Sequence, residues 1–484
     1  FAADLHDVSK GQASSEYGDP IEFFSRTYLT EGLRDLLTRA LRRLSGDANA
    51  SPVVNLQTNF GGGKTHSMLA LYHLFSGTEN DDFPQEIQDL IQDAGNPELD
   101  TLGVRRVTLV GTYLQAGSPS IKEDGTEVNT LWGELAWQLG GREAYNIVAG
   151  ADRSGTNPGE ALHTLISAHG PVLILIDEWV AYARQLVTDK ELPAGSFDTQ
   201  FTFAQSLTET VRGIPGAMLV VSIPASDGGK DGRGTDIEVG GTNGQLALER
   251  LQNVIRRVAD QWRPSSRDES FEIVRRRLFK EPDAQGLADI AVVARQFVTM
   301  YRNNAPSFPR DVSAANKDYE NRIRASYPLH PELLDRLYED WSTLERFQRT
   351  RGVLKLVSSI VHELWVNNND AAPLILPGNV PLSATRVNTD LTQYLEDQWK
   401  PIIDSDIDGV GSTAQRIDAG RSALGERSIT QRIARTIFIG AAPRSKTSHK
   451  GLDKQYLWLG TAIPGDPLGN FGTAVEQISQ RSTY

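Results

Sequence analysis

The feature that most constrains the fold is the segment Gly61-Gly62-Gly63-Lys64-Thr65. The apolar run from Pro52 to Leu56 precedes it and predicts a short buried strand, whereas helical spacing over Met68 to Leu74 follows it. A strand, a glycine-rich turn and a helix in this order are typical of a phosphate-binding loop with the pattern GxxxxGK[ST]. Thr58 replaces the first glycine of that pattern, but the Gly63-Lys64-Thr65 core is present.

The residue types of this segment suit an anion. Glycines allow backbone N–H groups to point toward a phosphate, and the helix that starts near Lys64 presents the positive end of its dipole. Lys64 is expected to reach the β- and γ-phosphates of ATP, and the Thr65 hydroxyl to ligate Mg²⁺. The alternative is a glycine-rich turn that carries a lysine by chance. The predicted nucleotide-binding residues are Asn59, Phe60, Gly61, Gly62, Gly63, Lys64, Thr65 and His66.

A second apolar strand, Val172 to Ile176, ends in two carboxylates, Asp177 and Glu178. A carboxylate at a strand tip can hold Mg²⁺ and its water shell, which assigns Asp177 as a metal ligand. The next side chain points to the other side of the strand end, so Glu178 is the candidate base that polarises the attacking water. The alternative is that these acids cap the helix that begins at Trp179.

A third apolar strand, Met218 to Val221, is followed by Ser222. In P-loop ATPases with a catalytic glutamate, a strand inserted between the two motif strands carries a polar residue that contacts the γ-phosphate or the water. Ser222 is the candidate for this role, with Ser226 as its substitute. A serine that closes a strand for capping reasons alone is the alternative.

Arginines cluster after this point. Arg256 and Arg257 precede an expected fifth strand, Val258 to Trp262. In ring- or dimer-forming ATPases that position reaches the γ-phosphate of a neighbour and stabilises transition-state charge. A solvated or DNA-facing basic surface is the alternative. Arg349 and Arg351 precede the helix predicted from Gly352, and Arg351 is the candidate lid arginine that senses the nucleotide in cis.

Composition limits the function classes. The 484 residues contain no cysteine, which excludes disulfides, cysteine-bound zinc, iron–sulfur clusters and thiol nucleophiles. A net charge of −13 argues against a chain coated with nucleic acid, although it leaves room for a local basic site. Since no apolar run approaches the roughly 20 residues of a membrane-spanning helix, we expect a soluble, cytoplasmic protein without a membrane partner.

Strands that alternate with helices predict an α/β fold, a P-loop parallel sheet with helices on both faces, over residues 1–264. An amphipathic helix is expected from Phe23 to Leu44, an acidic surface insertion from Thr78 to Asp100, and a mobile glycine-rich loop from Asp227 to Gly244. Residues 265–369 predict an α-helical lid domain.

The remaining residues, 370–484, predict a mixed C-terminal module, for which a winged helix is the named candidate. Three prolines, Pro373, Pro377 and Pro381, indicate a linker or an extended stretch at its start.

Three blocks carry a more specific resemblance: Phe23 to Leu33, Leu56 to His66, and Val172 to Trp179. With the nucleotide motifs, they resemble AAA-type P-loop ATPases and, within these, a bacterial family of large ATP-binding proteins associated with anti-phage defence. The resemblance implies an ATPase subunit that acts beside a DNA methyltransferase and a helicase or nuclease.

The expected function is therefore Mg²⁺-dependent ATP hydrolysis that drives a conformational change in a DNA-directed phage-defence assembly. The expected partners are ATP, further copies of the chain or the defence subunits, and DNA as a further candidate. The alternatives are a nucleotide-gated switch or scaffold with negligible turnover, and a DNA translocase.

Overall fold

The chain divides into two units, Ala2–Ser266 and Arg267–Tyr484, and each is described by itself. This boundary falls near the predicted end of the first domain at residue 264, whereas the predicted further division near residue 370 stays a prediction. A computed structural model describes residues 3–56, 63–187, 190–224, 241–262, 267–314, 317–344, 347, 349–367, 372–445 and 451–482.

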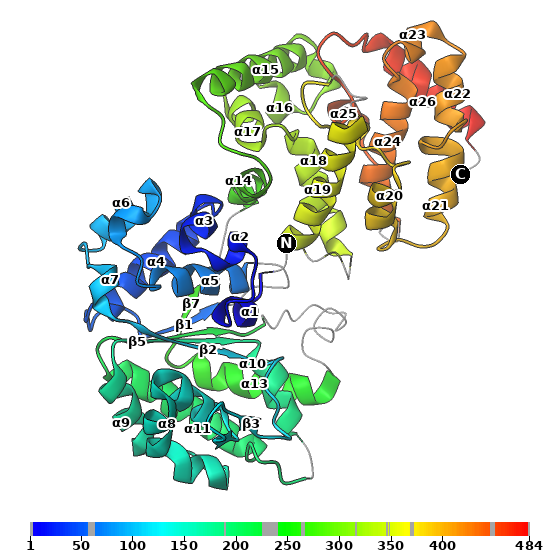
Figure 1. Ribbon diagram of the computed structural model, residues 1–484. Coiled ribbons are helices and arrows are strands. Elements are labelled where there is room, and N and C mark those ends of the chain that lie inside the picture. Colours follow the sequence, from blue (N-terminus) through cyan, green and yellow to red (C-terminus); the bar gives the residue numbers. More distant parts are fainter. Residues whose placement is uncertain are drawn as a thin grey trace. The chain divides into compact units, whose positions relative to one another are not determined.

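Five parallel strands form the main sheet of the first unit in the order β2-β5-β6-β1-β7 (Figure 1). In register, Asp177 follows the pair Ile176 and Val221, and Leu56 pairs with Ser222. The carboxyl ends of β1, β5 and β6 therefore meet at one edge. The strands are β1 (Val53–Leu56), β2 (Arg105–Val110), β5 (Val172–Asp177), β6 (Ala217–Ser222) and β7 (Asp260–Trp262).

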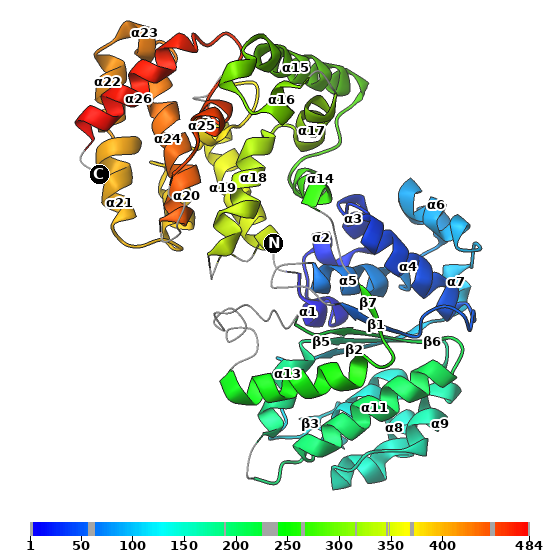
Figure 2. The ribbon, with the colours of Figure 1, turned by 180° about the vertical axis from the view of Figure 1, so that it is seen from behind.

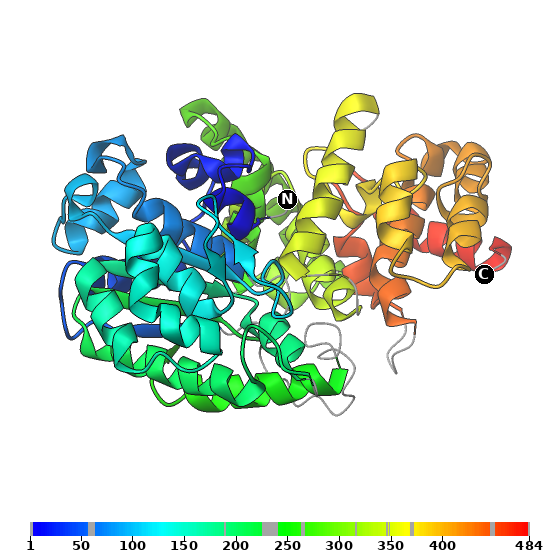
Figure 3. The same cartoon turned by 60° about the horizontal axis from the view of Figure 1, so that its bottom comes forward.

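Helices cover both faces of this sheet, which confirms the predicted α/β class (Figures 1 and 2). Along β5, Val172, Ile174 and Ile176 enter one hydrophobic core, and Leu173 and Leu175 enter the other. This alternation is the period of two that a strand imposes on its side chains. The first face is covered by α8 (Leu131–Ser154), α9 (Glu160–His169), α10 (Trp179–Ala183), α11 (Phe197–Gly213) and α13 (Gly241–Ile255), the cyan and green helices that come forward in Figure 3.

The second face is covered by helices from the start of the chain. A two-stranded hairpin, β3 (Ser120–Ile121) and β4 (Glu127–Val128), lies between β2 and α8. The helices of the second face are α1 (Leu5–Ser9), α2 (Ser15–Gly18), α3 (Pro20–Ser25), α4 (Glu31–Leu44), α5 (Lys64–Leu74), α6 (Gln85–Asp93) and α7 (Leu99–Leu102).

Two local predictions for this unit were wrong. The amphipathic run from Phe23 to Leu44 is two helices, α3 and α4, because Thr30 caps α4 by accepting a hydrogen bond from the Leu33 N–H at 3.0 Å. The acidic segment from Thr78 to Asp100 is more than a surface insertion, since Ile87, Leu90 and Ile91 of α6 are buried in the core. Of the predicted mobile loop, residues 227–240 lie outside the described residues and 241–244 open α13.

Within the described residues of the second unit, the regular secondary structure is helical, apart from one isolated β-bridge between Leu329 and Ile375. Its main helices are α14 (Arg267–Leu278), α15 (Ala284–Asn303), α16 (Arg310–Ser313), α17 (Asp318–Ser326), α18 (Pro331–Glu339), α19 (Arg349–Asn367), α20 (Thr385–Thr392), α21 (Trp399–Ile402), α22 (Thr413–Ala419), α23 (Ser422–Gly425), α24 (Ile429–Ala441), α25 (Lys454–Leu459) and α26 (Gly469–Arg481).

This helical unit corrects the prediction of a mixed C-terminal module. Over residues 372–445 and 451–482 the structure has none of the paired strands that the wing of a winged helix requires. The proline-rich stretch is not an exposed linker either, because Pro377, Val380 and Leu382 are buried against neighbouring helices. In the part of the chain that the structure describes, we find no helix with both the length and the apolar character needed to cross a bilayer.

Candidate functional site

The turn after β1 leads into α5 through Gly63. Its φ of +83° lies in the left-handed region that favours glycine, and Gly63 is the N-cap residue of α5. Lys64 and Thr65 form the first turn of this helix and are half-buried. The structure therefore places Lys64 and Thr65 at a helix N-terminus at the carboxyl edge of the sheet, where the dipole favours an anion. The other predicted loop residues, Asn59, Phe60, Gly61 and Gly62, lie outside the described residues.

Asp177, the last residue of β5, is the centre of the polar contacts at this edge. Its side chain is buried, and its Oδ2 accepts a hydrogen bond from the Thr65 Oγ1 at 2.9 Å. Its Oδ1 accepts a hydrogen bond from the Ser222 hydroxyl at the end of β6. Because the carboxyl ends of neighbouring parallel strands meet, two residues far apart in sequence, Thr65 and Ser222, both donate to the Asp177 carboxylate.

Glu178 begins the turn from β5 into α10 with a backbone φ of +53°, which is uncommon for a residue with a side chain. Its N–H donates to Asp177 Oδ1 at 3.0 Å and to the Ser222 Oγ at 3.2 Å. A Cβ at Gly111 would lie 2.1 Å from the Glu178 carbonyl oxygen, so the neighbouring β2 loop needs glycine there. Glu178 occupies the N-cap position of α10, but its side chain makes no capping bond.

The Glu178 side chain is exposed by surface area, yet the protein around its carboxyl changes its acidity. Loss of hydration raises the pKa of Glu178, and the charge of Asp177 adds to this rise. A hydrogen bond from the Thr112 side chain and the charge of Lys64 act in the opposite direction and lower the pKa. The net effect is a raised pKa for Glu178, in a position where Lys64 and Asp177 both influence it.

Ser222 lies where the sequence predicted, on a strand between β1 and β5. Its hydroxyl is buried and contacts Asp177 and the Glu178 backbone within the protein. Ser226, its predicted substitute, lies outside the described residues. The structure therefore assigns Ser222 a place beside the acidic pair.

The His66 side chain contacts Thr27 and Phe23, which are not the contacts that the predicted nucleotide-binding role implies. Its Nε2 lies 3.1 Å from the Thr27 Oγ1, and its ring lies 4.7 Å from the Phe23 ring, centroid to centroid. Thr27 also donates to the Phe23 carbonyl at 2.8 Å. These contacts connect the start of α5 with the segment between α3 and α4.

Within the first unit, the structure does not bring Arg256 and Arg257 to this edge. Arg256 and Arg257 are exposed in the turn before β7, and the start of a parallel strand lies at the amino edge of the sheet, opposite Asp177. Arg351 is exposed on α19, which belongs to the second unit, as does Arg349. Their proposed contacts with nucleotide stay predictions.

Sequence reasoning missed the loop after β2, which adjoins the Glu178 turn. Thr112 bonds to the Glu178 carboxyl, and the Tyr113 hydroxyl donates to Asp4 Oδ2 at 2.6 Å. The Tyr113 ring also stacks on His6 at 4.1 Å between ring centroids. The bond to Asp4 raises the pKa of Tyr113 to about 12. The available signal was the polar Gly111-Thr112-Tyr113 end of a predicted strand, but its place beside β5 needed the sheet order.

The donor set fits a magnesium nucleotide. A threonine hydroxyl and a carboxylate are hard oxygen ligands of the kind that Mg²⁺ prefers, and Mg²⁺ sites in phosphate-transfer proteins use one or two carboxylates together with substrate phosphates. Thr65 and Asp177 supply these groups within 2.9 Å of each other. Lys64 at the start of α5 supplies the positive charge for a phosphate.

Comparison with known families agrees with the division of the chain. Residues 1–261 match the DUF499 N-terminal domain, and residues 265–451 match the DUF499 second domain. The chain belongs to the DUF499 family. The polar contacts around Asp177 lie within the DUF499 N-terminal domain, and neither domain description names an activity. No curated protein matches this DUF499 chain.

Proposed function

We propose that this DUF499 chain binds ATP with Mg²⁺ and hydrolyses it, and that hydrolysis drives a conformational change in a DNA-directed phage-defence assembly. The observation that carries the proposal is the shared carboxylate of Asp177, which accepts hydrogen bonds from Thr65 and Ser222 beside Lys64 and Glu178. A nucleotide phosphate, its metal and an attacking water need an amine, hard oxygen ligands and a base close together.

Each side chain has a separate role in this proposal. Lys64 and the backbone N–H groups at the start of α5 bind phosphate oxygens, and Thr65 and Asp177 hold Mg²⁺. When bound, Mg²⁺ neutralises charge on the phosphates during transfer. Ser222 orients the Asp177 carboxylate through its hydrogen bond.

Glu178 is the proposed general base. Its raised pKa brings the carboxylate closer to the basicity that proton transfer requires near neutral pH. Glu178, in its left-handed turn, is exposed, whereas Asp177 is buried. One carboxylate can then hold a metal while the next accepts a proton.

The partners in this proposal come from the resemblance to anti-phage ATP-binding proteins. They are further copies of the chain or a DNA methyltransferase and a helicase or nuclease. Arg256 or Arg257 would act on the nucleotide of a neighbouring copy. Arg351 would act from the second unit as the lid arginine.

The test is steady-state ATP hydrolysis by wild type, Glu178→Gln and Lys64→Ala. We expect Glu178→Gln to lower kcat by at least about 100-fold, the contribution typical of a positioned base, while nucleotide binding persists. Lys64→Ala should weaken binding of the nucleotide itself. Glu209→Gln, a matched change at an exposed residue of α11, should leave the rate unchanged. Hydrolysis by Glu178→Gln at the wild-type rate would show that another group is the base.

One observation favours a nucleotide-gated switch as the second candidate. The Glu178 carboxyl is engaged by the Thr112 side chain, and a carboxylate held in this way is less available to a water. The same assay separates the two functions when it is repeated with DNA and with partner subunits. A wild-type rate equal to that of Lys64→Ala in every condition would support the switch.

A further inference from the structure

A cavity of about 220 Å³ lies in the first unit, beside the turn that carries Glu178. Its walls come from the loop after β2, the β3–β4 hairpin, the start of α8 and the short helix α10. Tyr113, Gln115, Asn129, Glu134 and Tyr182 are among its lining residues. None of these side chains has a role in the proposed hydrolysis, so the cavity needs its own explanation.

Tyr182 gives the first indication of a ligand. Its side chain is 2% exposed, and within the described residues its hydroxyl has no hydrogen-bond partner. Burial raises the pKa of this phenol well above its usual value, so the group stays neutral and can both donate and accept. A phenol hydroxyl that lines a cavity can both donate a hydrogen bond to, and accept one from, a group bound there.

Glu134 indicates which charge a ligand of this cavity would carry. Among the described lining residues it alone is a carboxylic acid or a basic side chain, and it is buried. Its Oε2 contacts the Lys122 ammonium, and its Oε1 accepts a hydrogen bond from Gln138 Nε2 at 3.0 Å. A carboxylate has about four acceptor positions, so both oxygens can accept further donors. The rings of Tyr113 and Tyr182 add aromatic surface that attracts cations.

The N-terminus of α8 also lies at this cavity, and a helix N-terminus by itself favours an anion. Here, however, the protein supplies the anion. The buried Asp152 accepts hydrogen bonds from the backbone N–H groups of Asn129 and Thr130, at 2.9 to 3.2 Å, and from the Thr130 hydroxyl. Because Asp152 compensates the helix dipole, the ion pair of Glu134 with Lys122 remains, and of this pair the Glu134 carboxylate is the group that lines the cavity.

The volume limits the size of the occupant. At about 30 Å³ per water molecule, 220 Å³ corresponds to roughly seven waters. Sites for drug-sized ligands start near 300 Å³, so this cavity suits a single long side chain or a small molecule of similar size.

We propose that this cavity binds an organic cation, a guanidinium or alkylammonium group, through Glu134, the Tyr182 hydroxyl and the two tyrosine rings. The group can be carried by an arginine or lysine side chain of a partner protein or by a free small molecule. This site goes beyond the proposed ATP hydrolysis and does not depend on it.

The experiment measures binding to the full 484-residue chain by calorimetry at low salt and without nucleotide, so that failure of the proposed hydrolysis would not affect it. The probes are N-acetylarginine amide, its neutral isostere N-acetylcitrulline amide, and agmatine. We expect the arginine probe to bind about tenfold or more tightly than the citrulline probe, because a hydrogen bond between charged groups is worth at least that factor.

Three variants test the residues. Glu134→Gln should weaken binding of the arginine probe by about tenfold, and Tyr182→Phe by a few-fold. Lys122→Met should tighten it, since Glu134 then loses its competing cation, a result that general damage to the fold would not produce. Tyr394→Phe in the second unit is the matched control and should change nothing.

Equal binding of arginine and citrulline probes would overturn the proposal, as would absence of binding by all three probes or binding that Glu134→Gln leaves unchanged. If the capped arginine probe binds at least as tightly as agmatine, the source is a protein side chain. If agmatine alone binds, the cation is a free small molecule.

Discussion

At the scale of single residues, Asp177 at the end of β5 connects the end of β6 with the first turn of α5 through one carboxylate. It accepts hydrogen bonds from Thr65 and Ser222 and from the Glu178 N–H. Buried carboxylates need such donors because an unpaired charge in the interior is costly. The contacts that suit a metal site therefore also satisfy the hydrogen-bonding capacity of the buried Asp177 carboxylate.

Thr112 is the residue whose effect on the site is easiest to measure. Its hydrogen bond lowers the pKa of Glu178, so Thr112→Val should raise that pKa further. The acidic limb of kcat/KM for ATP hydrolysis should then move to higher pH, because the base of the reaction would need a higher pH to be ionised. The measurement is the pH–rate profile of the variant against wild type.

Thr101→Val, at an exposed position outside the site, is the control for this comparison. Superimposable profiles for Thr112→Val and wild type would show that Thr112 does not influence the base.

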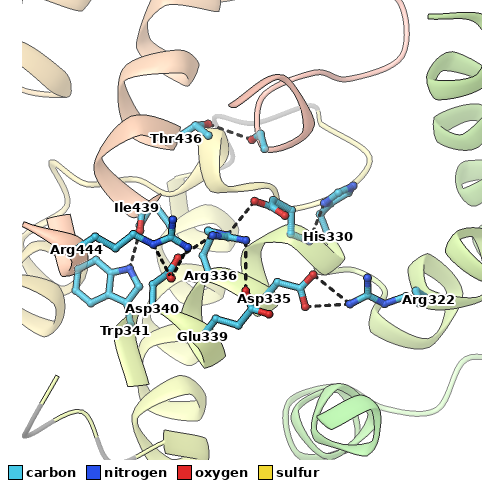
Figure 4. Close-up of polar contacts among 12 residues, drawn as sticks. Arg322, His330, Asp335, Arg336, Glu339, Asp340, Trp341, Thr436, Ile439 and Arg444 are labelled. Carbon is cyan, nitrogen blue, oxygen red and sulfur yellow. Dashed lines mark hydrogen bonds and ion pairs between the residues drawn. The ribbon is translucent and has the colours of Figure 1, made fainter. Parts of the chain in front are cut away.

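At the scale of an element, α18 carries a buried ionic network in the second unit (Figure 4). Arg336 lies within 2.9 Å of both Glu332 and Asp340, and Asp340 also pairs with Arg444 at 2.7 Å. One guanidinium is thus shared among several acids. Burial, with the charges of Asp335, Glu339 and Asp340, raises the pKa of Glu332 to about 8 even though the charge of Arg336 lowers it.

The pKa of His330, at the N-terminus of the same helix, is shifted in the opposite direction. Its Nδ1 accepts a hydrogen bond from the Glu332 N–H at 3.1 Å, and its Nε2 lies 2.8 Å from the Tyr301 hydroxyl. Burial lowers the pKa of His330 to about 3, so the ring is neutral. Its unfolded form gains a proton below about pH 6.5, which destabilises the fold toward acid.

These shifts predict how stability depends on pH. Above pH 6.5 the His330 contribution is constant, whereas Glu332 is ionised in the unfolded chain and still protonated in the fold up to about pH 8. The free energy of unfolding should therefore fall by about 2 kcal/mol as pH rises from 6.5 to 8, because the folded form binds one proton more than the unfolded form. Glu332→Gln should remove this fall, measured by denaturant unfolding across that range.

Glu209→Gln in the first unit is again the matched control. The same pH dependence in wild type and in Glu332→Gln would exclude Glu332 as the titrating group.

At the scale of the whole molecule, each unit has its own hydrophobic cores. The first unit buries side chains on both faces of its sheet, and the second buries them among helices. Units of this kind can unfold separately, because two-state behaviour is expected for single domains rather than for chains of several.

Calorimetry should therefore resolve two transitions. A non-hydrolysable ATP analogue with Mg²⁺, at 100 times its Kd, should raise the free energy of unfolding of the first unit by about 2.7 kcal/mol. The transition temperature of the first unit should therefore rise, and that of the second unit should stay the same. The Glu332→Gln variant at pH 8 identifies the transition of the second unit. Equal shifts of both transitions by the nucleotide would contradict the location of the site in the first unit.

Much of the first unit could be predicted because its signals are local. Each motif strand has its own apolar run, Asp177 and Ser222 follow two of those runs directly, and Lys64 follows the glycine-rich turn after a third. The second unit was harder. Pro377 and its neighbours have the composition of a linker, and only packing against α24 and neighbouring helices shows that they are buried.

Arg43 shows the same limit in a single residue. It belongs to the amphipathic run of α4, and its sequence context indicates an ordinary helix. In the structure its guanidinium is 1% exposed and donates to the carbonyls of Val211, Ile214 and Ala217, at the end of α11 and the start of β6. No pattern near Arg43 could predict partners about 170 positions away.

The sequence by itself determined the parallel α/β class and the strand ends that carry the polar residues, because hydrophobic period and glycine content act over a few neighbouring residues. The order of the strands, the place of Thr112 beside Glu178 and the cavity at Tyr182 were decided only by the tertiary structure. They depend on which strands pair and which helices pack together, and that choice minimises the free energy of the whole unit rather than of any one segment.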